Sequence, residues 1–158
     1  MNYLDKISYH LDRLSRGILA LLMSVMVSCV LFGVANRFIF KLPISWTEEV
    51  ARYLMVWICM LGSTIALKNG THVAVIYFIS KFNIKARNKI EFLNHILIIG
   101  FLLIPFIYGI KLCLSQMGQL SPALRISMFW PFLSVPAGCA IMIFHELVLI
   151  RLTPEHRT

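Results

Sequence analysis

Charged side chains are scarce in this sequence, and the scarcity is uneven. Only 14% of the 158 residues are charged, whereas a soluble domain has about 25%. Four stretches carry no charge at all, over 20, 15, 19 and 20 residues: 17–36, 53–67, 92–110 and 126–145. Since a helix needs about 20 residues to cross the hydrocarbon core of a bilayer, an ordinary soluble domain is excluded.

Motifs of catalysis and of metal binding are also missing. There is no C-x-x-C, and the four cysteines lie singly within apolar stretches, so neither a disulfide framework nor a zinc site is indicated. No G-x-S-x-G, H-E-x-x-H or P-loop occurs. We therefore expect no enzymatic activity and no cofactor bound by this chain.

The predicted fold is an all-α integral membrane protein, because the apolar stretches have helical length and lipid admits only helices and closed barrels. We expect one membrane domain, 1–158, with short interfacial amphipathic helices within 1–16 and 71–89. No A-x-A cleavage site follows the first apolar stretch, so it is expected to remain as a span. The four transmembrane helices are expected at 17–38, 47–67, 92–114 and 129–149.

Basic residues predict the orientation in the membrane. Ten of the 15 Lys and Arg residues lie in the two tails and in the loop between the second and third spans. Cytoplasmic loops are enriched in Lys and Arg, so both termini are expected in the cytoplasm. If the source is a Gram-negative bacterium, the chain lies in its inner membrane and the other two loops face the periplasm. The basic residues on the cytoplasmic side account for the net charge of +8. We therefore expect this charge to contact the headgroups of membrane lipids, and we expect no nucleic acid as a partner.

The stretch PISWTEEVAR begins the second span with charges that a lipid-facing helix does not need. Ser45 and Glu48 match the S-x-x-E capping box, in which each side chain bonds to the other residue's N–H. Glu48 also precedes Arg52 by four residues, the spacing of a helical ion pair. Glu49 joins Glu48 in the first turn, where the helix dipole favours negative charge. These charges are expected to cap the helix, to contact a partner, or to do both.

Small residues continue along the same helix. Gly62, Ala66 and Gly70 recur every four residues, which allows another helix to approach closely. The positions 48, 52, 55, 59, 62, 63 and 66 share one helical face. We expect such faces to bind a larger membrane protein, and packing among the four helices of this chain is the alternative. Further small residues lie in the first and fourth spans: Ser24, Ser28, Gly33, Ser134 and Gly138.

Ionisable groups are missing from the middles of the first and third spans. A transport pathway needs such groups at depth, or interrupted helices, so no ion or substrate site is expected on this chain. His95 and His145 are expected at similar depths, where two facing histidines could ligate a haem; wet or hydrogen-bonded histidines are the simpler expectation. Glu146 is expected to reach out to water.

Two motifs resemble the small, DctQ-like membrane subunit of tripartite ATP-independent periplasmic (TRAP) transporters. They are RFIFKLPISWTEEVARYLMVWICMLGSTIALKNGTHVAV and QLSPALRISMFWPFLSVPAGCAIM. The family often has Gly-Ile-Pro-Met where this chain has Arg-Ile-Ser-Met, so Arg125 and Ser127 depart from it. The matching residues are Arg37, Trp46, Glu48, Glu49, Arg52, Trp57, Gly62, Ala66, Gly70 and His72 in the first motif, and Ser121, Pro122, Ala123, Leu124, Met128, Val135, Pro136 and Gly138 in the second.

The resemblance implies a non-catalytic subunit that braces a large multi-span permease. It implies a periplasmic substrate-binding protein as a further partner, docked with help from residues 41–49 and 115–125. Transport would be secondary uptake of an organic acid, a C4-dicarboxylate or sialic acid, driven by sodium. Substrate and sodium sites are expected on the large subunit. The C-terminal RLTPEHRT gives no indication of fusion to that subunit.

Three alternatives are open at this point. A stand-alone four-span small transporter would carry a glutamate in its first span, which this chain lacks. A cytochrome-type subunit would use the histidine pair described above. An anchor subunit of another membrane complex would have the same four spans, and only its partner would distinguish it.

Overall fold

The computed structural model describes residues 3–41, 44–70 and 84–152. This part of the chain is almost wholly helical. Helix α1 (Tyr3–Ala35) continues into a π-helical turn, η1 (Asn36–Phe40), and is followed by α2 (Ser45–Gly70), α4 (Ile84–Ser115) and α5 (Phe129–Leu152). By length and composition, four segments are candidate membrane spans: Ile7–Ile39, Ser45–Lys68, Phe92–Ser115 and Phe129–Ile150. The prediction of an all-helical fold with four long apolar helices is confirmed.

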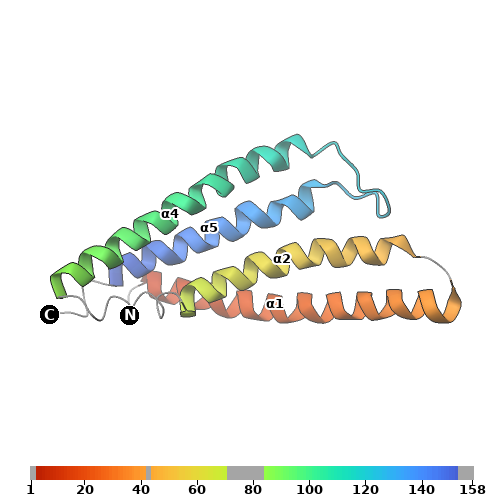
Figure 1. The fold of residues 1–158 in the computed structure, drawn as a ribbon, viewed down its shortest axis with the longest axis horizontal. Helices are drawn as coiled ribbons and strands as arrows, with labels where there is room; N and C mark the ends of the chain where they lie inside the picture. Colours follow the sequence, from red (N-terminus) through yellow and green to blue (C-terminus); the bar gives the residue numbers. More distant parts are fainter. Residues whose placement is uncertain (1–2, 42–43, 71–83, 153–158) are drawn as a thin grey trace.

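The helices form a fanned layer in the order α1, α2, α5, α4 (Figure 1). Each packs along its neighbour in that order, and α1 makes a smaller contact with α5. The start of α1 and the end of α5 lie at one end of the layer, together with the end of α2 and the start of α4. We call this end the base. The opposite end, with η1, Ile44 and residues 116–128, is called the loop end.

Helices α1 and α4 exceed the thickness of the hydrocarbon core by the largest margin. Helix α1 has 33 residues, which is about 50 Å at 1.5 Å per residue, against about 30 Å of hydrocarbon. A short interfacial helix was expected within residues 1–16, but residues 3–16 are the first turns of the continuous α1. The side chains of Ser8 and Asp12 there contact His145 of α5 and Lys68 of α2. Residues 84–89 likewise belong to α4, while 71–83 lie outside the described residues.

Helix α5 lies in the interior of the layer and carries most of the core. Cys139 and Met142 of α5 are buried with Leu102 of α4, and Met60 of α2 packs against them. A Cβ added to Gly138 would lie 2.9 Å from the Cβ of Met60, so only glycine allows α2 and α5 to approach this closely. Helix α1, in contrast, exposes most of its apolar side chains, as suits a helix that faces lipid.

Candidate partner-binding surface

The two motifs singled out in the sequence meet at the loop end through Glu49. This side chain is buried, although its neighbour Glu48 is exposed. One carboxylate oxygen of Glu49 accepts a hydrogen bond from the hydroxyl of Tyr53 at 2.5 Å. The other accepts from the backbone N–H groups of Ala123 and Leu124, at 2.9 and 3.1 Å. Glu49 therefore joins α2 to the loop between α4 and α5.

That loop is a compact turn held by its own backbone. The N–H of Ser121 donates to the carbonyl of Ile126 at 2.9 Å, and the N–H of Met128 donates to the carbonyl of Gln119 at 2.9 Å. Ser121 is buried, whereas Pro122 and Arg125 are exposed. The loop thus presents a defined surface at the end of the layer.

The two departures from the family pattern have a structural explanation. Arg125 has φ of 54°, the left-handed conformation that glycine adopts without steric cost. This fits the glycine that the family often has there. The hydroxyl of Ser127 donates to the carbonyl of Met117 at 2.9 Å and accepts from the N–H of Phe129 at 3.3 Å. It thereby satisfies a free donor at the start of α5.

The predicted capping box does not form among the described residues. Helix α2 begins at Ser45 itself, so Ser45 lies inside the first turn rather than before it. The hydroxyl of Thr47 instead donates to the carbonyl of Ile44 at 3.0 Å. The ion pair expected between Glu48 and Arg52 is also missing from the described part of the chain. Both side chains point outward and are exposed.

The predicted face of α2 lies on the surface. Met55 is 58% exposed, and nothing lies within 4 Å of a Cβ added to Gly62. The buried positions of α2 lie on its other side, at Thr47, Leu61 and Thr64. We call this surface the outer face of α2; it is exposed at Glu48, Arg52, Met55, Cys59, Ser63 and Ala66 and half-exposed at Gly62.

The small residues of the other helices have mixed positions. Gly33 packs against Thr47, and Gly138 against Met60, while Ser134 is fully buried. For these three, packing within the chain, the alternative weighed above, is correct. Ser24 and Ser28 are exposed and bond only to carbonyls of their own helix among the described residues.

The remaining predicted residues are divided between the surface and the interior. Arg37 is exposed near the loop end, and Trp46 is 40% exposed. Pro136 is buried in α5, against Gly109 of α4. Gly70 ends α2, and His72 lies outside the described residues.

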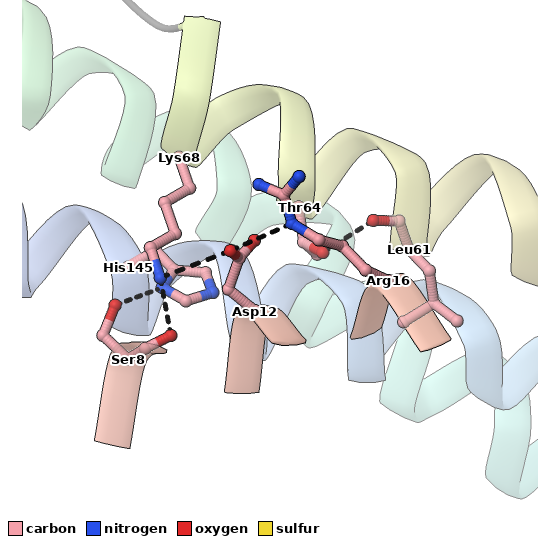
Figure 2. A network of polar contacts seen from close by, with 7 residues as sticks. All are labelled: Ser8, Asp12, Arg16, Leu61, Thr64, Lys68 and His145. Carbon is pink, nitrogen blue, oxygen red and sulfur yellow. Dashed lines mark hydrogen bonds and ion pairs between the residues drawn. The ribbon is translucent and has the colours of Figure 1, made fainter. Parts of the chain in front are cut away.

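A polar network at the base was not predicted (Figure 2). The ammonium of Lys68 donates to the carbonyl of Ser8 at 2.7 Å and lies 3.8 Å from a carboxylate oxygen of Asp12. The same oxygen is 3.1 Å from the Arg16 guanidinium. The Ser8 hydroxyl is hydrogen-bonded to Nδ1 of His145 at 3.0 Å. The network thus joins α1, α2 and α5 where they converge.

A second buried contact joins α4 to α5 at the base. Nδ1 of His95 lies 2.5 Å from Oε2 of Glu146, and Glu146 is fully buried. The expectation that Glu146 reaches water is therefore wrong, because a histidine partner holds it inside. His95 and His145 have different partners, which does not favour a shared haem. Within the described residues, no group of three potential metal ligands occurs.

Nothing local in the sequence identifies these contacts. Ser8 and His145 are 137 positions apart, and His95 and Glu146 are 51 apart. The sequence did show ionisable residues at the ends of apolar stretches. Because such groups need partners near lipid, their presence indicates that buried polar contacts form there, but it does not indicate between which residues.

Fold and surface together define a small multi-pass membrane protein with four candidate spans. A family model, "Tripartite ATP-independent periplasmic transporters, DctQ component", matches residues 26–153. The chain belongs to this family: it is a small permease subunit of a TRAP transporter and not an enzyme.

Individual relatives agree with this assignment. Over 126 residues, covering 80% of this chain and 73% of the relative, it is 27% identical to the sialic acid TRAP transporter small permease protein SiaQ of Vibrio cholerae. It is 25% identical over 99 residues to the isethionate TRAP transporter permease protein DctMQ of Oleidesulfovibrio alaskensis, covering 61% of this chain and 16% of that protein. It is 24% identical over 111 residues to the sialic acid TRAP transporter permease protein SiaT of Haemophilus influenzae, covering 70% of this chain and 18% of that protein.

Proposed function

We propose that this subunit binds and braces the large permease subunit of its transporter through the outer face of α2. The observation that carries this proposal is that small residues at Gly62 and Ala66 are left open, whereas those at Gly33 and Gly138 are filled by neighbouring helices. Small residues let helix backbones approach closely in lipid. Arg52 lies at one end of this face, makes no ion pair among the described residues, and supplies a charge that a partner can pair.

The relatives support a large subunit as the partner. The chain matches only 16% of DctMQ and 18% of SiaT, so a small-subunit region in each accompanies a much longer permease sequence. We expect a small subunit that is a separate chain to contact the large permease in the same way as the small-subunit region within DctMQ or SiaT contacts the rest of that protein. We therefore assign a separate or linked large permease as the occupant of the outer face.

Substrate and sodium sites belong on that large subunit. The buried ionisable groups that the structure describes are engaged in contacts between helices, at Glu49 near one end and at Asp12, His95, His145 and Glu146 near the other. The proposed transport is sodium-driven uptake of an organic acid, with sialic acid favoured by the relatives and a C4-dicarboxylate as the second candidate. This subunit binds no cofactor of its own.

The orientation proposed from the basic residues gives the two ends of the layer separate environments. The base, with the start of α1 and the end of α5 (Figure 1), faces the cytoplasm of a bacterial inner membrane. The loop end faces the periplasm, where the exposed Pro122 and Arg125 are available to the substrate-binding protein. The Glu49 carboxylate fixes the position of this loop, because it accepts hydrogen bonds from the backbone N–H groups of Ala123 and Leu124.

Reconstitution tests the transport proposal. Proteoliposomes that contain this chain and its large permease, with the binding protein added outside, are expected to accumulate sialic acid only under an inward sodium gradient. Vesicles with this chain alone provide the control and are expected to show no uptake. Uptake by this chain alone would contradict the proposal and favour a stand-alone transporter.

A further inference from the structure

A groove of about 500 Å³ runs between α1 and α2 at the loop end. Val30 and Val34 of α1 and Ala51 of α2 line it with apolar surface. Gly33 and Thr47 also line it and bring the two helices together, since a Cβ on Gly33 would lie 2.8 Å from the Thr47 hydroxyl oxygen. The groove therefore has apolar walls at the two valines and the alanine, beside the point where Gly33 and Thr47 bring α1 and α2 together.

Two opposite charges line the same groove from different helices. Arg37 comes from η1 and Glu48 from α2, and both are exposed. Neither makes an ion pair or a side-chain hydrogen bond with the residues that the structure describes. The site thus offers a planar cationic donor and an anionic acceptor beside apolar walls, and both charges are open to a ligand.

Neighbouring aromatic residues indicate the depth of the groove in a membrane. The rings of Phe32 and Trp46 lie 6.1 Å apart, at the ends of the two helices. Phe38 is 76% exposed and Ile39 is 72% exposed. Tryptophan concentrates at membrane–water interfaces, so Arg37 and Glu48 are at the level of lipid headgroups and the valines extend toward the hydrocarbon.

We propose that this groove binds a phospholipid with a zwitterionic, primary-ammonium headgroup, the phosphatidylethanolamine class. The phosphate accepts from the Arg37 guanidinium, whose fork geometry suits phosphate oxygens. The headgroup ammonium donates to the Glu48 carboxylate, and one acyl chain follows Val30 and Val34. A glycerol headgroup offers Glu48 only neutral hydroxyl donors, which bond a carboxylate more weakly than an ammonium does, and a choline headgroup has no N–H to donate to Glu48.

This inference requires that the chain spans a membrane, but not that it transports any substrate. It also separates the roles of the two neighbouring glutamates, since Glu48 contacts lipid at the edge of the outer face while Glu49 holds the loop. Lipid binding is therefore measured on the full chain alone, where failure of the transport proposal has no effect on the result.

Native mass spectrometry of the delipidated full chain provides the test, with phosphatidylethanolamine, phosphatidylcholine and phosphatidylglycerol of the same acyl chains added in turn. We expect phosphatidylethanolamine to bind about fivefold more tightly than phosphatidylglycerol, the upper range for one exposed charge pair. Glu48→Gln is expected to remove that preference, and Arg37→Ala to weaken binding of all three lipids. Lys111→Ala removes an exposed cation from the last turns of α4, outside the groove; it is the matched control and should match the unsubstituted chain.

Three results would overturn the proposal. One is equal binding of all three lipids by the unsubstituted chain. Another is an ethanolamine preference that persists in Glu48→Gln. The third is loss of bound phosphatidylethanolamine from the assembled two-subunit permease, which would assign the groove to the large subunit. Since Arg37 and Glu48 are exposed and have no bonding partner among the described residues, neither substitution is expected to prevent folding.

Discussion

At the residue scale, two adjacent glutamates have different roles. Glu49 accepts three hydrogen bonds that hold the loop onto α2, whereas Glu48 is exposed. We expect Glu49→Gln to speed amide hydrogen exchange at Ala123 and Leu124 by about tenfold, because hydrogen bonds to a charged acceptor are stronger than neutral ones. Glu48→Gln is the matched control, and exchange that is equally fast in both variants would contradict the assignment.

Arg125 supplies a second prediction at this scale. Its left-handed φ of 54° costs a residue with a Cβ about 1 kcal/mol. Arg125→Gly is therefore expected to raise the free energy of unfolding by up to about 1 kcal/mol, measured by denaturant titration in mixed micelles. Arg125→Ala keeps the strained backbone and removes the charge, so it should give no increase. A similar increase in the free energy of unfolding in both variants would contradict the prediction, because it would show that removal of the charge, and not relief of the backbone strain, stabilises the protein.

At the element scale, two glycines distinguish an internal helix contact from an open one. A Cβ on Gly138 would meet the Cβ of Met60 at 2.9 Å, whereas nothing lies within 4 Å of one on Gly62. Gly138→Ala should lower the free energy of unfolding by about 1 to 3 kcal/mol, the usual cost of overpacking. Gly62→Ala should leave it unchanged or raise it. Destabilisation by Gly62→Ala of the isolated chain would show that α2 packs differently.

The sequence predicted elements better than the contacts between them. The lengths of the uncharged stretches located the four helices. Helical periodicity placed Arg52, Met55 and Ala66 on one side of α2, and this side is the exposed outer face. The turn at Ser45 was misjudged, because the S-x-x-E pattern recurs by chance and the helix begins one residue too early for it. The continuous α1 was also missed, since a polar stretch such as 3–16 forms a surface helix or extends a span according to its tertiary partners.

At the scale of the whole molecule, the two hairpins α1–α2 and α4–α5 are connected at both ends. His145 makes the connection at the base, through Ser8 of α1, and Glu49 makes it at the loop end. The sequence could not pair these residues, because their partners are 137 and 74 positions away. We expect a layer connected in this way to resist bending, as the proposed bracing role requires.

The central claim is that the outer face of α2 binds the large permease, and quantitative co-purification from gently solubilised membranes tests it most directly. We expect Gly62→Leu combined with Ala66→Leu to reduce recovery of the large subunit by about tenfold or more. Overpacking a close contact costs about 1 to 3 kcal/mol at each site, and about 1.4 kcal/mol is a tenfold loss of affinity. Gly100→Leu is the matched control, because Gly100 is an exposed glycine of α4 with nothing within 4 Å. Full recovery with the double variant, or equal loss with the control, would contradict the claim.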